Sequence, residues 1–193
     1  MPFQPIKHIL FASILLTLTA CSDNTNNLNA PVGADTDSDG IEDSDDDFSL
    51  NAIGFEDANF ARCVKSAFDD MGAVSLSEIT VLECPSMSIS SVTHLNAFPS
   101  LDHLNLYENN LTEIDVTQNT ALTYLHSGRN QLTEIDVTKN TALTYLHSGS
   151  NQLTEIDVTQ NTALTVLDLK LNPLTPSAIG NLRTINWIDD LSW

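Results

Sequence analysis

The sequence predicts a solenoid, a coil of short repeating units in which each unit packs only against its neighbours. The first observation is a fixed period, because residues 132–152 repeat residues 111–131 with only two substitutions. The second is that apolar residues recur at the same places in five consecutive units between residues 79 and 174. The third is that aromatic residues make up only 6% of the chain, which suits a thin core of aliphatic side chains. Units of this size cannot bury their apolar side alone, and stacking them creates one continuous core.

The charge of the chain excludes one class of partner. Its 193 residues include 26 acidic and 7 basic ones, which gives a formal net charge of −19. A chain this acidic repels phosphate backbones, so we expect no nucleic-acid partner. The same charge is compatible with solubility outside the cell and with the binding of divalent cations. The sequence contains no nucleophile motif and no glycine-rich phosphate loop, so we assign no catalytic residue. We expect a binding protein rather than an enzyme, and we expect it to be a monomer.

The N-terminus predicts export. Lys7 precedes an apolar run over residues 9–20 that is too short to span a bilayer, which is the pattern of a signal peptide over residues 1–20. The residues Leu-Thr-Ala-Cys that end at Cys21 resemble the lipobox of bacterial lipoproteins. The resemblance implies cleavage before Cys21, acylation of its side chain and stable anchoring in a membrane. The alternative is an ordinary secretory signal followed by an incidental cysteine.

Ser22 bears on the membrane in which such an anchor would insert. By the sorting rule of Gram-negative lipoproteins, a serine directly after the lipidated cysteine resembles an outer-membrane address. The resemblance therefore implies a lipid-anchored protein of the bacterial cell envelope, in the outer membrane.

Residues 21–54 are predicted to form a disordered acidic linker, because they are rich in Asn, Asp, Ser and Thr and poor in large apolar residues. Within residues 35–46 the spacing D-x-D-x-D-G-x-x-D-x-x-D resembles the calcium loops of thrombospondin type 3 repeats. The resemblance implies a calcium site with oxygen ligands from Asp35, Asp37, Asp39, Asp43, Asp46 and the backbone carbonyl of Ile41. The alternative is a solvated acidic tether that charge repulsion keeps extended.

Two further cysteines, Cys63 and Cys84, follow the linker. An export signal implies an oxidising compartment, where these two most simply form one disulfide. The bond would close a loop of about 20 residues and stabilise the fold by roughly 3 kcal/mol. Two separate buried thiols are the alternative.

A helical N-terminal cap is predicted over residues 55–78. Its apolar residues follow a helical period: Phe60, Val64, Ala67 and Phe68. Asp57 and Asn59 are the candidate N-caps of this helix. A cap is needed because the core of the first repeat would otherwise be open to water.

The repeats over residues 79–174 share one signature. Four of the five units follow L-x-x-L-x-L-x-x-N-x-L, with serine in place of the third leucine in two of them, and the first unit is a degraded copy with Ile79, Leu82, Cys84, Met87 and Ile89. The signature resembles the leucine-rich repeat and, at 21 residues, its internalin-like bacterial group. The resemblance implies a β-rich α/β fold, a right-handed solenoid with short parallel strands on its concave face that binds proteins or glycans. One asparagine in each of the four complete units is predicted to bond the backbone of its own and the adjacent turn: Asn109, Asn130, Asn151 and Asn172.

The return segment of each unit is too short to form a full helix. We expect it to be extended, with Ile114 and Val116 pointing inward and a turn at residues 118–119. Ser127 and Ser148 each replace a core leucine, and we expect them to bond each other.

A short C-terminal cap is predicted over residues 175–193. The residues Leu182, Ile185 and Trp187 suggest a last degenerate turn, with Trp187 closing the core.

The register of the repeats predicts two columns of side chains on the concave face. The first column is Val81, His103, Tyr124, Tyr145 and Val166, and the second is Glu83, Asn105, His126, His147 and Asp168. Aromatic and histidine side chains suit a contact with protein or sugar. The candidate ligand-binding residues are therefore His103, Asn105, Tyr107, Tyr124, His126, Arg129, Tyr145, His147 and Asp168.

Two alternatives to a binding face remain. Strands about 4.8 Å apart would let His126 and His147 share a metal with Asp168, as in a metal-dependent enzyme. A polar ladder copied by recent duplication is favoured over this metal site. The other alternative is a structural envelope protein whose repeats act as a spacer.

Acidic side chains form a further pair of columns, on the return side: Glu113, Glu134 and Glu155, and Asp115, Asp136 and Asp157. Salt screens the repulsion between exposed like charges, so we expect these columns to keep the outer face soluble. Calcium bridging between them is the lesser alternative.

Overall fold

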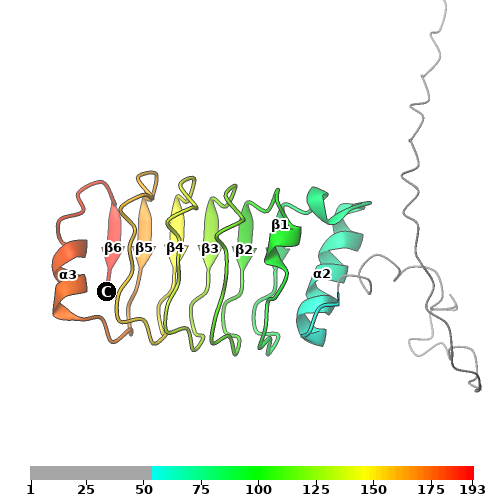
Figure 1. The fold of residues 1–193 in the computed structure, drawn as a ribbon, viewed down its shortest axis with the longest axis horizontal. Helices are drawn as coiled ribbons and strands as arrows, with labels where there is room; N and C mark the ends of the chain where they lie inside the picture. Colours follow the sequence, from blue (N-terminus) through cyan, green and yellow to red (C-terminus); the bar gives the residue numbers. More distant parts are fainter. Residues whose placement is uncertain (1–53) are drawn as a thin grey trace, which may run out of the picture. The chain divides into compact units, whose positions relative to one another are not determined.

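The computed structural model describes residues 54–193 and confirms the predicted solenoid. Cys21 and the acidic motif over residues 35–46 lie outside the described residues. Within the described part, six short parallel strands lie side by side in chain order (Figure 1). They are β1 (Val81–Glu83), β2 (His103–Asn105), β3 (Tyr124–His126), β4 (Tyr145–His147), β5 (Val166–Asp168) and β6 (Asp190–Ser192). Each strand from β1 to β5 is followed by a return segment that leads to the next strand.

The central residue of each repeat strand forms the middle of the core. From β1 to β5 it is a leucine with no exposed surface: Leu82, Leu104, Leu125, Leu146 and Leu167. Neighbouring strands pair these leucines directly opposite one another. Because side chains alternate along a strand, the residues before and after each leucine point to solvent. The register predicted from the repeats is therefore confirmed.

The predicted asparagine ladder is confirmed. The Nδ2 of Asn130 donates to the carbonyl of Ser127 in its own turn, at 3.1 Å, and to that of Leu106 in the preceding turn, at 2.9 Å. Its Oδ1 accepts from the N–H of Leu111 at 3.0 Å. The same three kinds of bond recur at Asn109, Asn151 and Asn172. The ladder satisfies backbone groups that water cannot reach.

A second asparagine ladder lies on the return side. The sequence predicts only a turn at residues 118–119, whereas the structure also buries the side chain of Asn119 and its equivalents, Asn140 and Asn161. Asn140 Nδ2 donates to the carbonyls of Val116 and Asn119, at 2.9 and 2.8 Å. Asn161 likewise donates to the carbonyl of Asn140, whereas Asn119, the first of the three, donates to the carbonyls of Leu95 and Phe98. The inward orientation follows from the extended return, whose carbonyls need donors inside the coil.

The core also contains the expected pair of serines. Ser127 and Ser148 have no exposed surface, and their hydroxyl oxygens are 2.7 Å apart. The predicted inward positions of Ile114 and Val116 also hold, since Val116 is fully buried and Ile114 packs against the core.

The N-terminal end is capped by the helix α2 (Ala58–Met71), as predicted. Asp57 is its N-cap, and its Oδ1 accepts from the N–H groups of Asn59 and Phe60 at 2.9 and 3.0 Å. Buried residues of α2 join the core of the first turn. A disulfide joins Cys63 of this helix to Cys84, which confirms the predicted bond. Two short 3-10 helices, η1 (Leu76–Glu78) and η2 (Leu95–Ala97), precede β1 and β2.

The prediction for the C-terminal turn is wrong in detail. A helix, α3 (Pro176–Leu182), begins after the N-cap Thr175, with proline in its first turn, where a missing N–H costs nothing. This helix lengthens the last return segment. The strand partner of Leu167 is therefore Leu191, and not one of the residues Leu182, Ile185 and Trp187 that were predicted to form the last turn. Trp187 is partly buried but lies outside the core cluster. Among residues 54–193, no helix is both long and apolar enough to cross a membrane.

Candidate functional site

The candidate site is the strand face, which we define as the solvent side of the sheet formed by the first and third residues of each strand. The two predicted columns are present with the predicted pairing. Strand β6 extends them by Asp190 and Ser192. The candidate ligand-binding residues on the strands therefore share one continuous surface, and Tyr107 and Arg129 lie at its edge, beyond the strand ends.

Three rings of the first column form a stack. The ring centres of His103 and Tyr124 are 4.1 Å apart with planes 3° from parallel, and those of Tyr124 and Tyr145 are 4.5 Å apart at 8°. Parallel strands hold equivalent residues about 4.8 Å apart, which is the spacing that stacked rings need. Both faces of the Tyr124 ring are therefore covered by neighbouring rings. Partial burial, followed by the proximity of Tyr145, raises the pKa of Tyr124.

The second column contains a matching stack. The rings of His126 and His147 are 4.2 Å apart and 8° from parallel. Tyr107 meets His126 edge to face, with ring centres 4.8 Å apart. The guanidinium of Arg129 lies 5.6 Å from the centre of the Tyr107 ring, within the range of a cation–π contact. The aromatic surface therefore continues from the strands to the edge of the sheet.

Burial favours the uncharged form of His126 at the centre of the strand face. It lowers the pKa of His126 to about 4, with a further contribution from the neighbouring His147. The Nδ1 atoms of both rings are buried and have no hydrogen-bond partner among the described residues. At pH 7 the His126 ring is therefore uncharged, and this part of the surface would contact a ligand by packing and neutral hydrogen bonds.

Two glycines make room for the histidine stack, and sequence reasoning missed their role. A Cβ on Gly128 would lie 2.6 Å from Nδ1 of His147, closer than side chains tolerate. A Cβ on Gly149 would lie 3.1 Å from the Lys170 carbonyl and 3.3 Å from the His147 ring. The signal was available, because a glycine follows Ser127 and Ser148 at the same place in both units. Only the packed structure shows what the missing side chain leaves space for.

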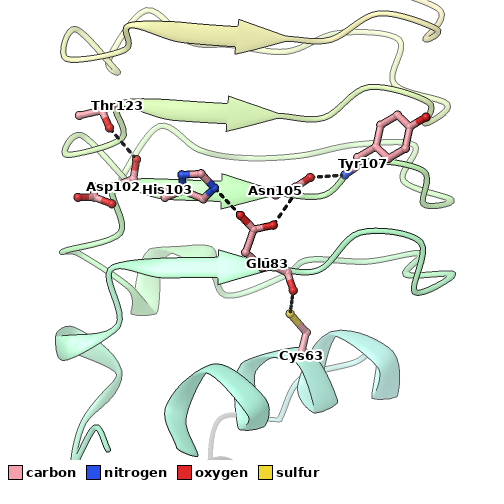
Figure 2. Close-up of polar contacts among 7 residues, drawn as sticks. All are labelled: Cys63, Glu83, Asp102, His103, Asn105, Tyr107 and Thr123. Atoms are coloured by element: carbon pink, nitrogen blue, oxygen red, sulfur yellow. Dashed lines mark hydrogen bonds and ion pairs between the residues drawn. The ribbon is translucent and has the colours of Figure 1, made fainter. Parts of the chain in front are cut away.

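Carboxylates flank the aromatic centre at both ends. Glu83 accepts from Nε2 of His103 at 2.6 Å and from Nδ2 of Asn105 at 2.7 Å (Figure 2). At the other end, Nε2 of His147 lies 3.4 Å from Oδ2 of Asp168. The strand face is therefore a partly apolar centre between two acidic ends.

The structure does not assemble His126, His147 and Asp168 as a metal centre. Nitrogen lone pairs lie in the plane of the imidazole ring, and the two rings are nearly parallel, so their lone pairs do not converge on one point. Within residues 54–193 there is no group of three or more His, Cys, Asp or Glu side chains placed to hold a metal ion. The histidine column is instead a stack that contacts Asp168 at one end.

Comparison with known proteins supports the fold. The functional domain of InlJ from Listeria monocytogenes, described as including a cysteine ladder, is 41% identical with a TM-score of 0.62, and the match covers 66% of this chain and 29% of that one. An internalin, InlF, from the same species is 20% identical with a TM-score of 0.53, and the match covers 69% of this chain and 49% of that one. The chain thus spans less than a third of the first and about half of the second. No protein-family profile matches the chain, and no curated protein matches it. The solenoid is an internalin-like leucine-rich-repeat fold.

Proposed function

We propose that this chain is a non-enzymatic lipoprotein of the bacterial cell envelope that binds a protein through its strand face. The observation that carries the proposal is the double stack of aromatic and histidine rings across β2, β3 and β4. Rigid aromatic side chains contribute large contact areas at low entropic cost, which is why they are frequent at the centres of protein interfaces. The internalin-like fold supports the same function.

The stacking favours a protein over a glycan as the ligand. A sugar ring packs flat against an open aromatic face, but here each inner face of Tyr124 is covered by a neighbouring ring. Ring edges and hydroxyl groups are available instead, and these suit side chains and backbone groups of a protein partner.

A photo-crosslinking experiment tests the site and works with an unidentified partner. We expect benzoylphenylalanine at Tyr145 to capture the partner on intact cells, because the ring lies partly exposed at the centre of the strand face. The same photoreactive residue at Thr141, exposed on the return side, is the matched control. The Tyr145 adduct should disappear when Tyr124, His126 and His147 are replaced by alanine. Equal adducts from Tyr145 and Thr141 would place the contact elsewhere.

The lipid anchor is tested by Cys21→Ala. Loss of the acylated side chain should move the protein from the membrane to the soluble fraction, because no other anchor is proposed. Ultracentrifugation followed by immunoblotting measures the distribution, with Ser22→Ala as the control that keeps the cysteine. An unchanged distribution of the Cys21→Ala protein would contradict the lipoprotein assignment.

The proposed calcium motif is tested separately from the anchor. A peptide of residues 30–50 should bind calcium with measurable heat in calorimetry, because five aspartates and one carbonyl supply the oxygen ligands that Ca²⁺ prefers. A peptide with Asp37→Asn and Asp39→Asn should give little heat. A flat trace for the native peptide at millimolar calcium would leave this segment as a tether only.

A further inference from the structure

A long groove lies on the return side of the solenoid, away from the strand face. It has a volume of about 1390 Å³ and crosses the return segments of three consecutive turns. Residues 91–96 line one end, and α3 with the segment through Trp187 lines the other. Ile114, Ile135 and Ile156 lie in equivalent positions along it and provide an apolar floor.

Carboxylates line both sides of this floor. In each turn a glutamate precedes the isoleucine and an aspartate follows it: Glu113, Glu134 and Glu155, and Asp115, Asp136 and Asp157. Neither lysine nor arginine is among the lining residues of the described chain. Lys139 acts on Asp136 from outside the groove. The groove is therefore apolar along its centre and strongly negative along its edges.

Hydrogen bonds favour the charged form of the three aspartates. Asp115 Oδ1 accepts from the hydroxyl and the N–H of Thr117, at 2.6 and 2.9 Å. The hydroxyl bond first, and the N–H bond second, lower the pKa of Asp115. The same bonds lower the pKa of Asp136 and Asp157. The carboxylates are held at regular spacing rather than gathered at one point, and no metal-binding cluster forms among residues 54–193.

We propose that this groove binds an extended basic segment of a partner protein, with apolar side chains on the isoleucine floor and Lys or Arg side chains on the two acidic edges. The groove extends over three turns and the units that line its two ends, with neighbouring turns about 4.8 Å apart. Its length therefore equals that of about six residues of extended chain at 3.3 Å per residue. Long basic side chains can lie along apolar surface while their charges reach the carboxylates. The acidic linker of this chain is not a suitable occupant, because residues 22–53 contain no Lys or Arg. A second copy, with a net charge of −19, is also repelled.

The test uses the full chain and a capped peptide of about eight residues that alternates Lys and Val, long enough to span the groove. Trp187 lies in the groove, and the sequence contains one other tryptophan, Trp193. In the Trp193→Phe protein, tryptophan fluorescence therefore comes from Trp187 and reports on the groove. We expect saturable binding at low salt. The groove variant, Glu113→Gln with Glu134→Gln and Glu155→Gln, should bind roughly 10-fold more weakly, because three exposed ion pairs are lost.

The matched control removes the same charge from the helical cap by Glu56→Gln, Asp69→Asn and Asp70→Asn. Its affinity should stay close to that of the native chain. Equal weakening of both variants would mean attraction to net charge and would overturn the proposal. Tight binding of the corresponding peptide of Glu and Val, or no binding of the Lys and Val peptide to the native chain, would also overturn the proposal. Loss of binding when Tyr124 and Tyr145 are replaced would overturn it as well. Because this last variant tests the strand face, failure here is distinguishable from failure of the proposed function.

Discussion

Replacing Asn140 by alanine is expected to lower the free energy of unfolding by roughly 3 kcal/mol. The side chain is fully buried and its two N–H groups satisfy the carbonyls of Val116 and Asn119. Each carbonyl keeps one backbone donor, the N–H of Asn119 for Val116 and the N–H of Leu122 for Asn119. The cost is therefore the loss of two buried hydrogen bonds, about 1 kcal/mol each, together with the packing of the amide. The Oδ1 of Asn140 has no hydrogen-bond partner within the described chain, so its removal offsets part of this loss.

Urea unfolding followed by circular dichroism measures the change. The neighbouring exposed Lys139→Ala is the control and should stay within about 0.5 kcal/mol of the native chain. Asn140→Asp should destabilise at least as much as alanine at pH 7, because it keeps the shape but directs a carboxylate at two carbonyl oxygens. If Asn140→Ala unfolds like the native protein, the second ladder contributes no stability.

Removing the Cys63–Cys84 disulfide should lower the free energy of unfolding by roughly 3 kcal/mol, because the bond joins two residues with a sequence separation of 21 and so restricts the unfolded chain. The effect should be concentrated at the N-terminal end, because the bond fastens α2 to the turn that contains β1. Loss of the fastened helix would expose the core below Phe60 and Val64. In a repeat protein an unprotected end unit unfolds first.

Hydrogen exchange with and without reductant measures where protection is lost. Protection should fall first in α2 and β1, and only slightly in β4 and β5. The Cys63→Ala, Cys84→Ala protein is the control, because reductant should not change it further. Uniform loss of protection along the chain would show that the disulfide stabilises the solenoid as a whole and not its cap.

The candidate site was predictable from sequence in its membership but not in its geometry. The repeat places Tyr124 next to Tyr145 and His126 next to His147, because equivalent residues of stacked turns lie side by side. The near-parallel stacking of these rings depends on rotamers and on the space left by Gly128, which a linear pattern does not encode. The lowered pKa of His126 likewise depends on burial by its neighbours.

The C-terminal turn shows a different limit. Its spacing departs from the 21-residue repeat, and the segment containing Leu182 resembles the repeat signature closely enough to mislead. Helix α3 takes up the extra residues, and β6 pairs with β5 later in the chain than the pattern suggests. The groove on the return side ends against this helix and the segment after it, so its boundary could not be predicted either.

The sequence by itself determined the period, the register of the strands, the first asparagine ladder and the disulfide. These features repeat or pair locally, and a repeated local pattern places the same side chain in the same environment on every turn. Only the tertiary structure decided that Asn119, Asn140 and Asn161 point inward, that the rings stack, and that the acidic columns border a groove. Those features depend on the distance and angle between one turn and the next, and on the irregular ends that stop the coil.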